Sequence, residues 1–217
     1  MPFDFDYARG RMIEAHIVRR GIREPRLLEA LRQVPREAFV SAGLEEFAYD
    51  DTPLAIGAGQ TISQPYIVAL MIERSEIGAD DTVLEIGTGS GYAAAVAGRL
   101  ARDVFTIERH RVLADEAVER FCRLGFGNIH VRVGDGTMGW PEVAPFDAIM
   151  VAAGSPAIPQ TLKEQLVIGG RLVMPVGPES RQRLVRLVRT AASTYDEEDV
   201  GGVRFVPLIG GEGGVAG

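Results

Sequence analysis

The 217-residue sequence has a single cysteine, a deficit of positive charge and no long apolar run. One cysteine, Cys122, excludes a disulfide within the chain and favours a reducing compartment. The net charge of −7 makes nucleic acid an unfavourable general partner, and no residue pattern indicates a metal site. No apolar segment is long enough to cross a bilayer, and no signal-peptide pattern opens the chain. We therefore expect a cytoplasmic monomer that binds neither nucleic acid nor membrane.

What the sequence does contain is a strand, a glycine turn and a helix in immediate succession. Residues 82–86 form a short apolar run with β-branched members, which predicts a buried strand. Gly87, Gly89 and Gly91 follow at once, and without a Cβ they let the backbone approach a ligand closely. The alanine-rich segment 93–100 predicts a helix. This succession is typical of the first ligand crevice of a doubly wound α/β sheet.

The turn departs from the dinucleotide-binding fingerprint because Tyr92 stands where that pattern needs a glycine. Instead, Glu85 lies two residues before three alternating glycines, which resembles the first motif of class I S-adenosylmethionine-dependent methyltransferases. That cofactor carries a sulfonium and an amino-acid group but no phosphate, so carboxylates matter more to its binding than phosphate-cradling amides. We therefore expect cofactor contacts from the turn and its flanks, at Glu85, Gly87, Thr88, Gly89, Ser90 and Tyr92.

Downstream of the turn, strand and helix patterns alternate, which is typical of a parallel sheet. The patterns predict strands over 104–107, 129–133, 146–151 and 170–175, and helices over 112–124 and 159–167. Segments 184–188 and 203–208 predict late antiparallel strands, and the acidic run 196–199 between them predicts a solvated loop. The predicted fold class is α/β, with a doubly wound, mostly parallel, Rossmann-like sheet.

The segment before the sheet, 8–35, has two apolar periodicities, which predict two helices separated by Gly21. Six arginines in and after it are interpreted as a solvated helix face: Arg19, Arg20, Arg23, Arg26, Arg32 and Arg36. We expect one methyltransferase domain over 1–210, in which 1–75 supplies helices and an active-site loop and 76–210 binds the cofactor. The glycine-rich tail 211–217 is expected to be flexible.

Ligands of such sheets bind beyond the carboxyl ends of the strands. Glu108 ends the second parallel strand, where a carboxylate can accept both hydroxyls of a ribose, and Arg109 follows it. Asp135 ends the next strand and is suited to accept the adenine amino group, while Gly136 leaves room for the ring. These four residues complete the cofactor contacts expected from the strand ends.

The segment 49–66 has weak periodicity, two glycines, two prolines and several hydroxyl and amide groups. It predicts a loop or short irregular hairpin of a length that usually carries function in a compact domain. Within it, Gln60, Thr61, Ile62 and Tyr66 are expected to shield or contact the cofactor.

Seven segments spread over the chain resemble the protein-L-isoaspartate O-methyltransferase family: 34–40, 59–66, 87–92, 134–136, 144–149, 169–177 and 204–208. The most specific of them is 59–66, which reads Gly-Gln-Thr-Ile-Ser-Gln-Pro-Tyr. The resemblance implies S-adenosylmethionine as cofactor and L-isoaspartyl residues of damaged proteins or peptides as substrate. The methyl group goes to the free α-carboxylate, and the ester then closes to a succinimide whose hydrolysis returns some normal aspartate.

The resemblance gives the active-site role to Ser63, whose hydroxyl can orient the substrate carboxylate by hydrogen bonding. A carboxylate is already ionised at neutral pH, so no strong base is needed and positioning should dominate the catalysis. Residues expected to grip the peptide backbone, besides Ser63, are Ile56 in the same loop and the edge formed by Val206, Pro207 and Leu208.

Three positions depart from the usual pattern of the family. Ala55 replaces a proline, which predicts a less rigid loop; Thr137 stands where an aromatic is frequent beside adenine; and Gly154 follows Ala153 where alanine or proline is usual. None removes a chemically required group, so they bear on substrate affinity more than on reaction type. Two alternatives stay open: a methyltransferase for another carboxylate acceptor, and a non-catalytic module that binds the cofactor.

Overall fold

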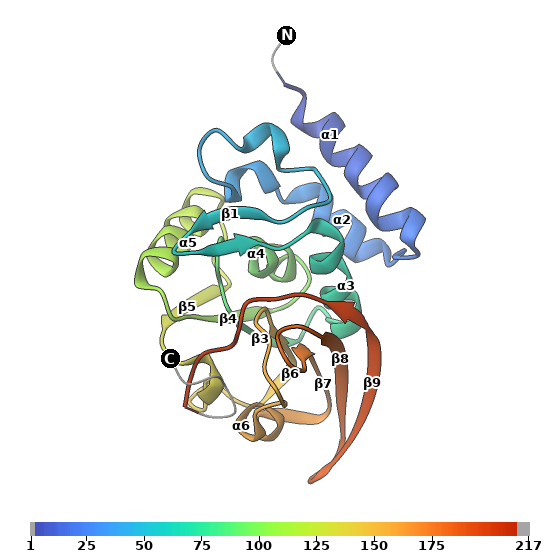
Figure 1. Ribbon diagram of the computed structural model, residues 1–217, viewed down its shortest axis with the longest axis vertical. Coiled ribbons are helices and arrows are strands. Elements are labelled where there is room, and N and C mark those ends of the chain that lie inside the picture. Colours follow the sequence, from blue (N-terminus) through green and yellow to red (C-terminus); the bar gives the residue numbers. More distant parts are fainter. Residues whose placement is uncertain (1–2, 212–217) are drawn as a thin grey trace.

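The computed structural model describes residues 3–211 and contains a seven-stranded sheet between helical layers (Figure 1). Its helices are α1 (Phe5–Met12), α2 (Pro25–Gln33), α3 (Pro65–Ser75), α4 (Tyr92–Gly98), α5 (Arg111–Arg123) and α6 (Gln160–Glu164). Its strands are β1 (Leu54–Gly57), β2 (Gln60–Ile62), β3 (Thr82–Ile86), β4 (Asp103–Glu108), β5 (Ile129–Val133), β6 (Phe146–Val151), β7 (Leu166–Val176), β8 (Gln182–Ala191) and β9 (Thr194–Val203). Short π or 3₁₀ turns cover Ile13–Ile17, Val18–Arg20, Arg36–Phe39, Glu45–Phe47 and Gly136–Met138.

The strand order of the large sheet is β5-β4-β3-β6-β7-β8-β9. The first five strands in this order run parallel, and β8 and β9 continue the sheet by antiparallel pairing. The chain builds β3, β4 and β5 toward one edge and then returns to the other side of β3 with β6. The order therefore reverses between β3 and β6, which is where ligands bind in sheets of this kind. The doubly wound, mostly parallel fold is confirmed.

Alternating strand residues build a hydrophobic core on each face of the sheet. Val83 and Val104 face a core shared with the N-terminal helices and with α3, α4 and α5. Leu84 and Ile149 face a second core, to which α6 contributes Leu162. Because the N-terminal helices belong to the first core, the irregular segment between α2 and α3 is fixed in place beside the sheet.

The N-terminal elements match the prediction of two helices. Gly21 ends the first helical segment in a left-handed conformation with φ of 100°, and Pro25 opens α2. The interpretation of the arginines as a solvated face is wrong for Arg36, which is completely buried. Arg36 lies in a turn that faces the first core, and backbone carbonyls of two loops accept its hydrogen bonds.

The acidic run 196–199 is part of strand β9, so the prediction of a loop there is wrong. The run stays in a strand because its carboxylates meet arginines across the ladder, as Asp199 meets Arg183 at 2.6 Å. Strand β9 is at the edge of the sheet and pairs with β8 only, and an edge strand tolerates charged side chains well.

The segment 204–208 is extended but is outside the named strands, which also differs from the prediction. It leaves the sheet after Val203 and forms an isolated bridge between Pro207 and Gly154. Figure 1 shows this segment, in red, running from β9 back across the molecule. Residues 212–217 of the predicted flexible tail lie outside the described residues. Across residues 3–211, no helix has the length and apolar character needed to cross a membrane.

Candidate active site

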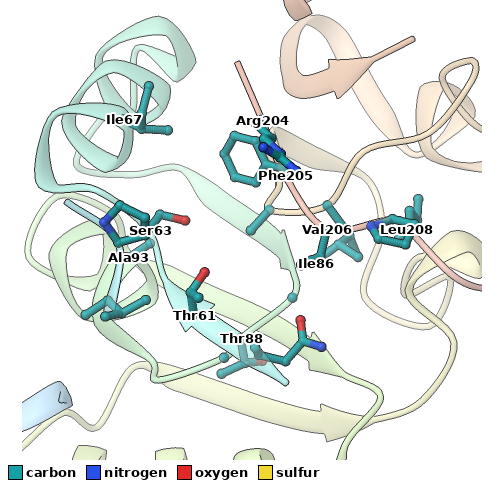
Figure 2. Close-up of a pocket in the computed structure, with 18 of the residues that line it drawn as sticks. Thr61, Ser63, Ile67, Ile86, Thr88, Ala93, Arg204, Phe205, Val206 and Leu208 are labelled. Carbon is teal, nitrogen blue, oxygen red and sulfur yellow. The ribbon is translucent and has the colours of Figure 1, made fainter. Parts of the chain in front are cut away.

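A cavity of ≈ 1030 Å³ lies at the carboxyl ends of the central parallel strands (Figure 2). Three parts of the chain form its walls: the glycine turn with the neighbouring strand ends, the β1–β2 hairpin, and the C-terminal segment 202–209. Pockets for small molecules commonly measure roughly 300–1,000 Å³. This cavity is therefore large enough for a cofactor together with part of a second ligand.

The glycine turn forms the floor of the cavity with bare backbone. Gly87, Gly89 and Gly91 have φ values of 92°, 52° and 90°, a region that side chains disfavour. A Cβ at Gly91 would lie 2.7 Å from the ring of Phe121, and one at Gly87 would lie 3.4 Å from Ala152. The three glycines thus suit the turn itself, and two of them, Gly87 and Gly89, line the cavity and leave its floor open to close approach by a ligand.

Glu108 lies at the end of β4 and is held against the glycine turn. Its Oε2 accepts the backbone N–H of Gly89 at 2.9 Å, and its Oε1 accepts that of His110 at 2.9 Å. The residue is only 4% exposed, yet it lines the cavity. Each carboxylate oxygen keeps a free lone pair, so a fixed acceptor for two neighbouring hydroxyls faces the cavity.

Glu85 is buried beneath the turn, is 2% exposed and is absent from the cavity wall. The β3–β4 register places it opposite Thr106, whose hydroxyl donates to Glu85 Oε2 at 2.6 Å. Thr88 Oγ1 lies 2.6 Å from Thr106 Oγ1 and completes a chain of three side chains. Burial, with a smaller contribution from the charge of Glu108, raises the pKa of Glu85 to about 8. Glu85 thus supports the turn from below, and its contact with the cofactor stays a prediction.

Asp135 caps the short turn that follows β5. Its Oδ1 accepts the backbone N–H of Thr137 at 2.9 Å and the Thr137 hydroxyl at 2.7 Å, and its Oδ2 accepts the N–H of Gly211 at 2.8 Å. Desolvation works to raise the pKa of Asp135, but hydrogen bonds from Gly211 and Thr137 outweigh it and hold the pKa below its usual value. Asp135 itself is not in the cavity wall, whereas Gly136 is, and a Cβ there would overlap Ile86.

The β1–β2 hairpin forms the wall opposite the glycine turn and confirms the prediction of a short irregular hairpin. Leu54 pairs with Ile62, and a register shift follows Ala55. The Ala55 carbonyl accepts the hydroxyl of Ser41 at 3.2 Å, which anchors the strand although a proline is absent. Figure 2 shows Thr61 and Ser63 pointing from this wall into the cavity.

Hydrogen bonds at the Ser63 carbonyl and at the residues that follow it fix this part of the backbone. The Arg36 guanidinium donates from Nη2 to the Ser63 carbonyl at 2.8 Å. The Asp51 carboxylate accepts Gln64 Nε2 at 2.7 Å and the backbone N–H of Tyr66 at 3.3 Å. The Tyr66 ring is covered by another arginine and is outside the cavity wall.

The C-terminal segment forms the third wall and is hydrogen-bonded to the loop that follows β6. Gly154 donates its N–H to the Val206 carbonyl at 2.8 Å and accepts the N–H of Leu208 at 2.7 Å. The Gln182 side chain pairs with the backbone of Phe205, accepting its N–H at 2.7 Å and donating to its carbonyl at 3.2 Å. This segment therefore acts as an ordered wall although it lies outside the sheet.

Most of the residues predicted from the sequence line this one cavity: Gln60, Thr61, Ile62, Ser63, Gly87, Thr88, Gly89, Ser90, Tyr92, Glu108, Arg109, Gly136, Val206, Pro207 and Leu208. The predicted residues outside the wall are Ile56, Tyr66, Glu85 and Asp135. Ile56 packs over Gly89, where its Cδ1 would lie 3.4 Å from an added Cβ. The sequence reasoning missed Gln182, Phe205 and the loop 179–181, because their position depends on long-range strand pairing.

The donor and acceptor groups of the cavity fit a nucleoside cofactor without phosphate. The floor has a paired acceptor in Glu108, and the wall has small residues at Gly134 and Gly136. No cluster of His, Cys, Asp and Glu able to hold a metal ion occurs among residues 3–211. The hydroxyl of Ser63 faces the same space from the opposite wall. The arrangement can hold one ligand on the floor and a second one against Ser63.

Comparison with known proteins agrees with this geometry. The model of the Protein-L-isoaspartate(D-aspartate) O-methyltransferase (PCMT) family matches residues 8–213. A protein-L-isoaspartate O-methyltransferase 1 of Rhodopseudomonas palustris is 58% identical over 210 residues, which cover 96% of this chain and 86% of that protein. The protein-L-isoaspartate O-methyltransferase of Brucella anthropi is 56% identical over 208 residues, which cover 95% of each chain.

Two solved structures have the same fold. One is a protein-L-isoaspartate O-methyltransferase with a TM-score of 0.81 and 30% identity, and the match covers 91% of this chain and 65% of that one. The other, from Plasmodium falciparum, was solved with S-adenosyl-L-homocysteine. It has a TM-score of 0.81 and 22% identity, and the match covers 95% of this chain and 98% of that one. At this identity the likeness shows the fold alone. By its family match and its relatives, this chain belongs to the protein-L-isoaspartate(D-aspartate) O-methyltransferase family.

Proposed function

We propose that the chain transfers a methyl group from S-adenosylmethionine to the free α-carboxylate of L-isoaspartyl residues in damaged proteins or peptides. The methyl ester then closes to a succinimide, which starts repair. The observation that carries the proposal is the cavity itself, where Ser63 faces a glycine turn and a fixed carboxylate across ≈ 1030 Å³ of space. Family membership supports the same reaction.

When bound, S-adenosylmethionine supplies a methyl group attached to a positively charged sulfur. The residues of the floor would hold it by shape and hydrogen bonding. Glu108 presents an immobile carboxylate to the two ribose hydroxyls, since two backbone N–H groups already fix its orientation. Gly87 and Gly89 would let the amino-acid end lie against the backbone, and Gly136, which lines the cavity wall, would lie beside the adenine ring.

The substrate side needs a group that orients a carboxylate, and Ser63 provides it. A carboxylate is ionised at neutral pH, so no residue has to remove a proton from it. Charge is neutralised as the methyl group transfers, so strong stabilisation of the separated charges would favour the ground state. The Ser63 hydroxyl would therefore act by holding one oxygen in line, while Thr61 and Val206 help to exclude water.

The same positioning explains a preference for the isoaspartyl linkage. In that linkage the backbone runs through the side-chain carbon, and the carboxylate sits directly on Cα. A normal aspartate carries its carboxylate one methylene further out. A site that grips the flanking backbone, with Ser63 on one side and the segment Val206 to Leu208 on the other, would misplace the aspartate carboxylate. A displacement of about 1 Å can cost roughly a hundredfold in rate.

The test is a methyl-transfer assay on matched peptides that differ only in this linkage, with labelled S-adenosylmethionine. We expect labelling of the isoaspartyl peptide to exceed that of the aspartyl peptide by roughly a hundredfold or more. Equal labelling of both peptides would contradict the proposal. Labelling of a small carboxylic acid but of neither peptide would favour another acceptor, and cofactor binding without turnover would favour a non-catalytic module.

The remaining expectations on partners and location are also proposals. We propose a monomer that acts in the cytoplasm and binds no nucleic acid. The net charge of −7 disfavours nucleic acid as a partner, and the single cysteine fits a reducing compartment. Light scattering after size exclusion measures the mass in solution, and the mass of a dimer would contradict the proposed monomer.

A further inference from the structure

We propose that Arg36 is a positioning residue for methyl transfer: its buried guanidinium fixes the backbone of Ser63 relative to the glycine turn. This inference rests on the proposed function, because it explains how the active-site loop is aligned for that reaction. Arg36 is outside the cavity wall, so it acts through Ser63 and not by touching a ligand.

The guanidinium ties together segments that are distant in the sequence. Arg36 lies in the turn that follows α2 and is 0% exposed. Its Nε donates to the Ala48 carbonyl at 2.7 Å, and its Nη2 donates to the Ser63 carbonyl at 2.8 Å. One rigid, planar group thereby holds the Arg36–Phe39 turn, the loop at Ala48 and the backbone at Ser63 at fixed distances from one another.

The same group also contacts the cofactor side of the cavity. The Arg36 guanidinium carbon lies 4.8 Å from the centre of the Tyr92 ring, and Tyr92 is the first residue of the helix after the glycine turn. Phe39 also packs edge-on against the Tyr92 ring, at 5.6 Å between ring centres. Ser63 and the helix behind the glycine turn therefore share one neighbour, which links the substrate wall to the cofactor wall.

The charge of Arg36 needs an explanation, because no carboxylate in the described chain forms an ion pair with it, and Asp51 attracts it only from a greater distance. A buried cation without an ion pair is costly, and an apolar side chain of similar shape would pack there at lower cost. Burial lowers the pKa of Arg36 to about 10, so the group still carries its charge at neutral pH. A fold-stabilising role alone does not require this residue type, whereas a rigid two-armed donor to loop carbonyls does.

The arrangement around Ser63 agrees with a positioning role. Arg36 holds the carbonyl of Ser63, and Asp51 holds Gln64 and the N–H of Tyr66 on the following side. Both anchors follow the Ser63 Cα directly along the chain, and the Ser63 side chain itself points into the cavity. Removing Arg36 would release the anchor nearest to this side chain and leave the Asp51 anchor in place.

The experiment compares Arg36→Met, Arg36→Lys and the control Arg171→Met in the full-length protein. Arg171 also donates to two backbone carbonyls, those of Ser75 and Glu76 at the C-terminal end of α3; unlike Arg36 it pairs with a carboxylate, Asp81, and it is outside the cavity. For each variant we measure kcat on the isoaspartyl peptide, the Kd of S-adenosylhomocysteine, the melting temperature, and amide hydrogen exchange of peptides that cover 59–66.

For Arg36→Met we expect kcat to fall about tenfold to a hundredfold, the Kd to stay within about threefold, and exchange over 59–66 to accelerate. Arg36→Lys, which keeps the charge and one donor, should recover part of kcat. The control Arg171→Met should lower the melting temperature but leave kcat and the exchange of 59–66 unchanged.

Three outcomes would overturn the proposal. One is an Arg36→Met variant with the kcat and loop exchange of the wild type. Another is a parallel loss of kcat and of cofactor affinity, which would place the effect on the cofactor. If Arg36→Met does not fold, an Arg36→Lys variant with wild-type loop exchange would overturn it equally. Loop exchange needs no turnover, so it separates failure of this inference from an inactive wild type, which would instead refute the proposed reaction.

Discussion

The floor of the cavity comes from one strand–turn–helix unit and the strand ends beside it. The remaining walls come from two segments far apart in the sequence, the β1–β2 hairpin that leads to Ser63 and the C-terminal segment 202–209. On the floor, the carboxylates are buried and already hydrogen-bonded, as Glu108 is to Gly89. On the opposite wall, Thr61 is exposed and Val206 is 37% exposed. The floor is thus preformed, while the opposite wall leaves groups available for a large and variable ligand.

This difference separates two kinds of specificity. A preformed floor recognises one small molecule by fixed acceptors and close backbone approach. A wall built from a hairpin and an extended segment offers backbone groups, and these recognise a linkage without reading the side chains of the substrate. Substitutions on the floor should therefore change cofactor affinity, and substitutions on the wall should change turnover or peptide choice.

The largest effect is expected from Glu108→Ala, which would remove the fixed acceptor of the floor. Two hydrogen bonds donated by ribose hydroxyls to a charged acceptor, at about 1.5 kcal/mol each, amount to roughly a hundredfold in Kd. Calorimetry with S-adenosylhomocysteine measures this, with the exposed helix variant Glu119→Ala as control. Unchanged affinity in a folded Glu108→Ala protein would break the assignment of the floor to the cofactor.

The next effect is on the wall, where Ser63→Ala should lower kcat while the cofactor Kd stays within a few-fold. Loss of one oriented hydrogen bond to a charged acceptor corresponds to about 1.5–3 kcal/mol. A steady-state assay on the isoaspartyl peptide measures it. The matched control is Ser75→Ala, which removes a hydroxyl that donates to the Met71 carbonyl within α3. Full activity of Ser63→Ala would mean that the wall orients the substrate by other groups.

A third effect concerns Glu85 beneath the floor and the pH dependence of the free energy of unfolding. The folded protein keeps the proton on Glu85 up to about pH 8, whereas the unfolded chain releases it near 4.5. The folded state therefore binds more protons between these values, and the free energy of unfolding should fall as pH rises, by at most about 1.4 kcal/mol per pH unit. Glu85→Gln should flatten this slope in urea titrations of the ligand-free protein. A slope equal to that of the wild type would show that Glu85 is ionised in the fold.

The smallest effect concerns the rim of the wall. Arg181 precedes Gln182 and Arg204 follows Val203, which form the last β8–β9 pair, and both arginines line the cavity. Peptides with glutamate beside the isoaspartyl residue should therefore be methylated a few-fold better than peptides with lysine, since exposed charge pairs contribute about 0.2–1 kcal/mol. The double variant Arg181→Gln, Arg204→Gln should abolish the difference, and high salt should reduce it. Equal KM values for both peptides in the wild type would contradict this.

The floor could be predicted from the sequence because its causes are local. Residues 82–86 have the composition of a buried strand, and Gly87, Gly89 and Gly91 mark left-handed positions whatever the rest of the chain does. Glu108 was found by its place at a strand end. What the sequence could not show is that Glu85 meets Thr106, since that contact depends on the register of two parallel strands.

The wall was predicted only in part because its causes are long-range. The composition of 49–66 predicts an irregular hairpin, and β1 and β2 confirm it. The sequence predicts a strand over 203–208, but from Arg204 on this segment leaves the sheet and bonds to Gly154 instead, so tertiary contacts override its local pattern. The burial of Arg36 had no local signal, because an arginine beside a helix is usually solvated.

The contact between Gly154 and Gln182 has a consequence for how this family varies. A Cβ on Gly154 would overlap the Gln182 amide, and that amide holds both backbone groups of Phe205. The glycine that departs from the usual pattern is therefore matched to a glutamine almost thirty residues later. Across relatives, we expect the two positions to co-vary, with alanine at the first accompanied by a shorter or differently oriented side chain at the second. Gly154→Ala alone should loosen the C-terminal segment, and adding Gln182→Ala should relieve the overlap without restoring the bonds to Phe205.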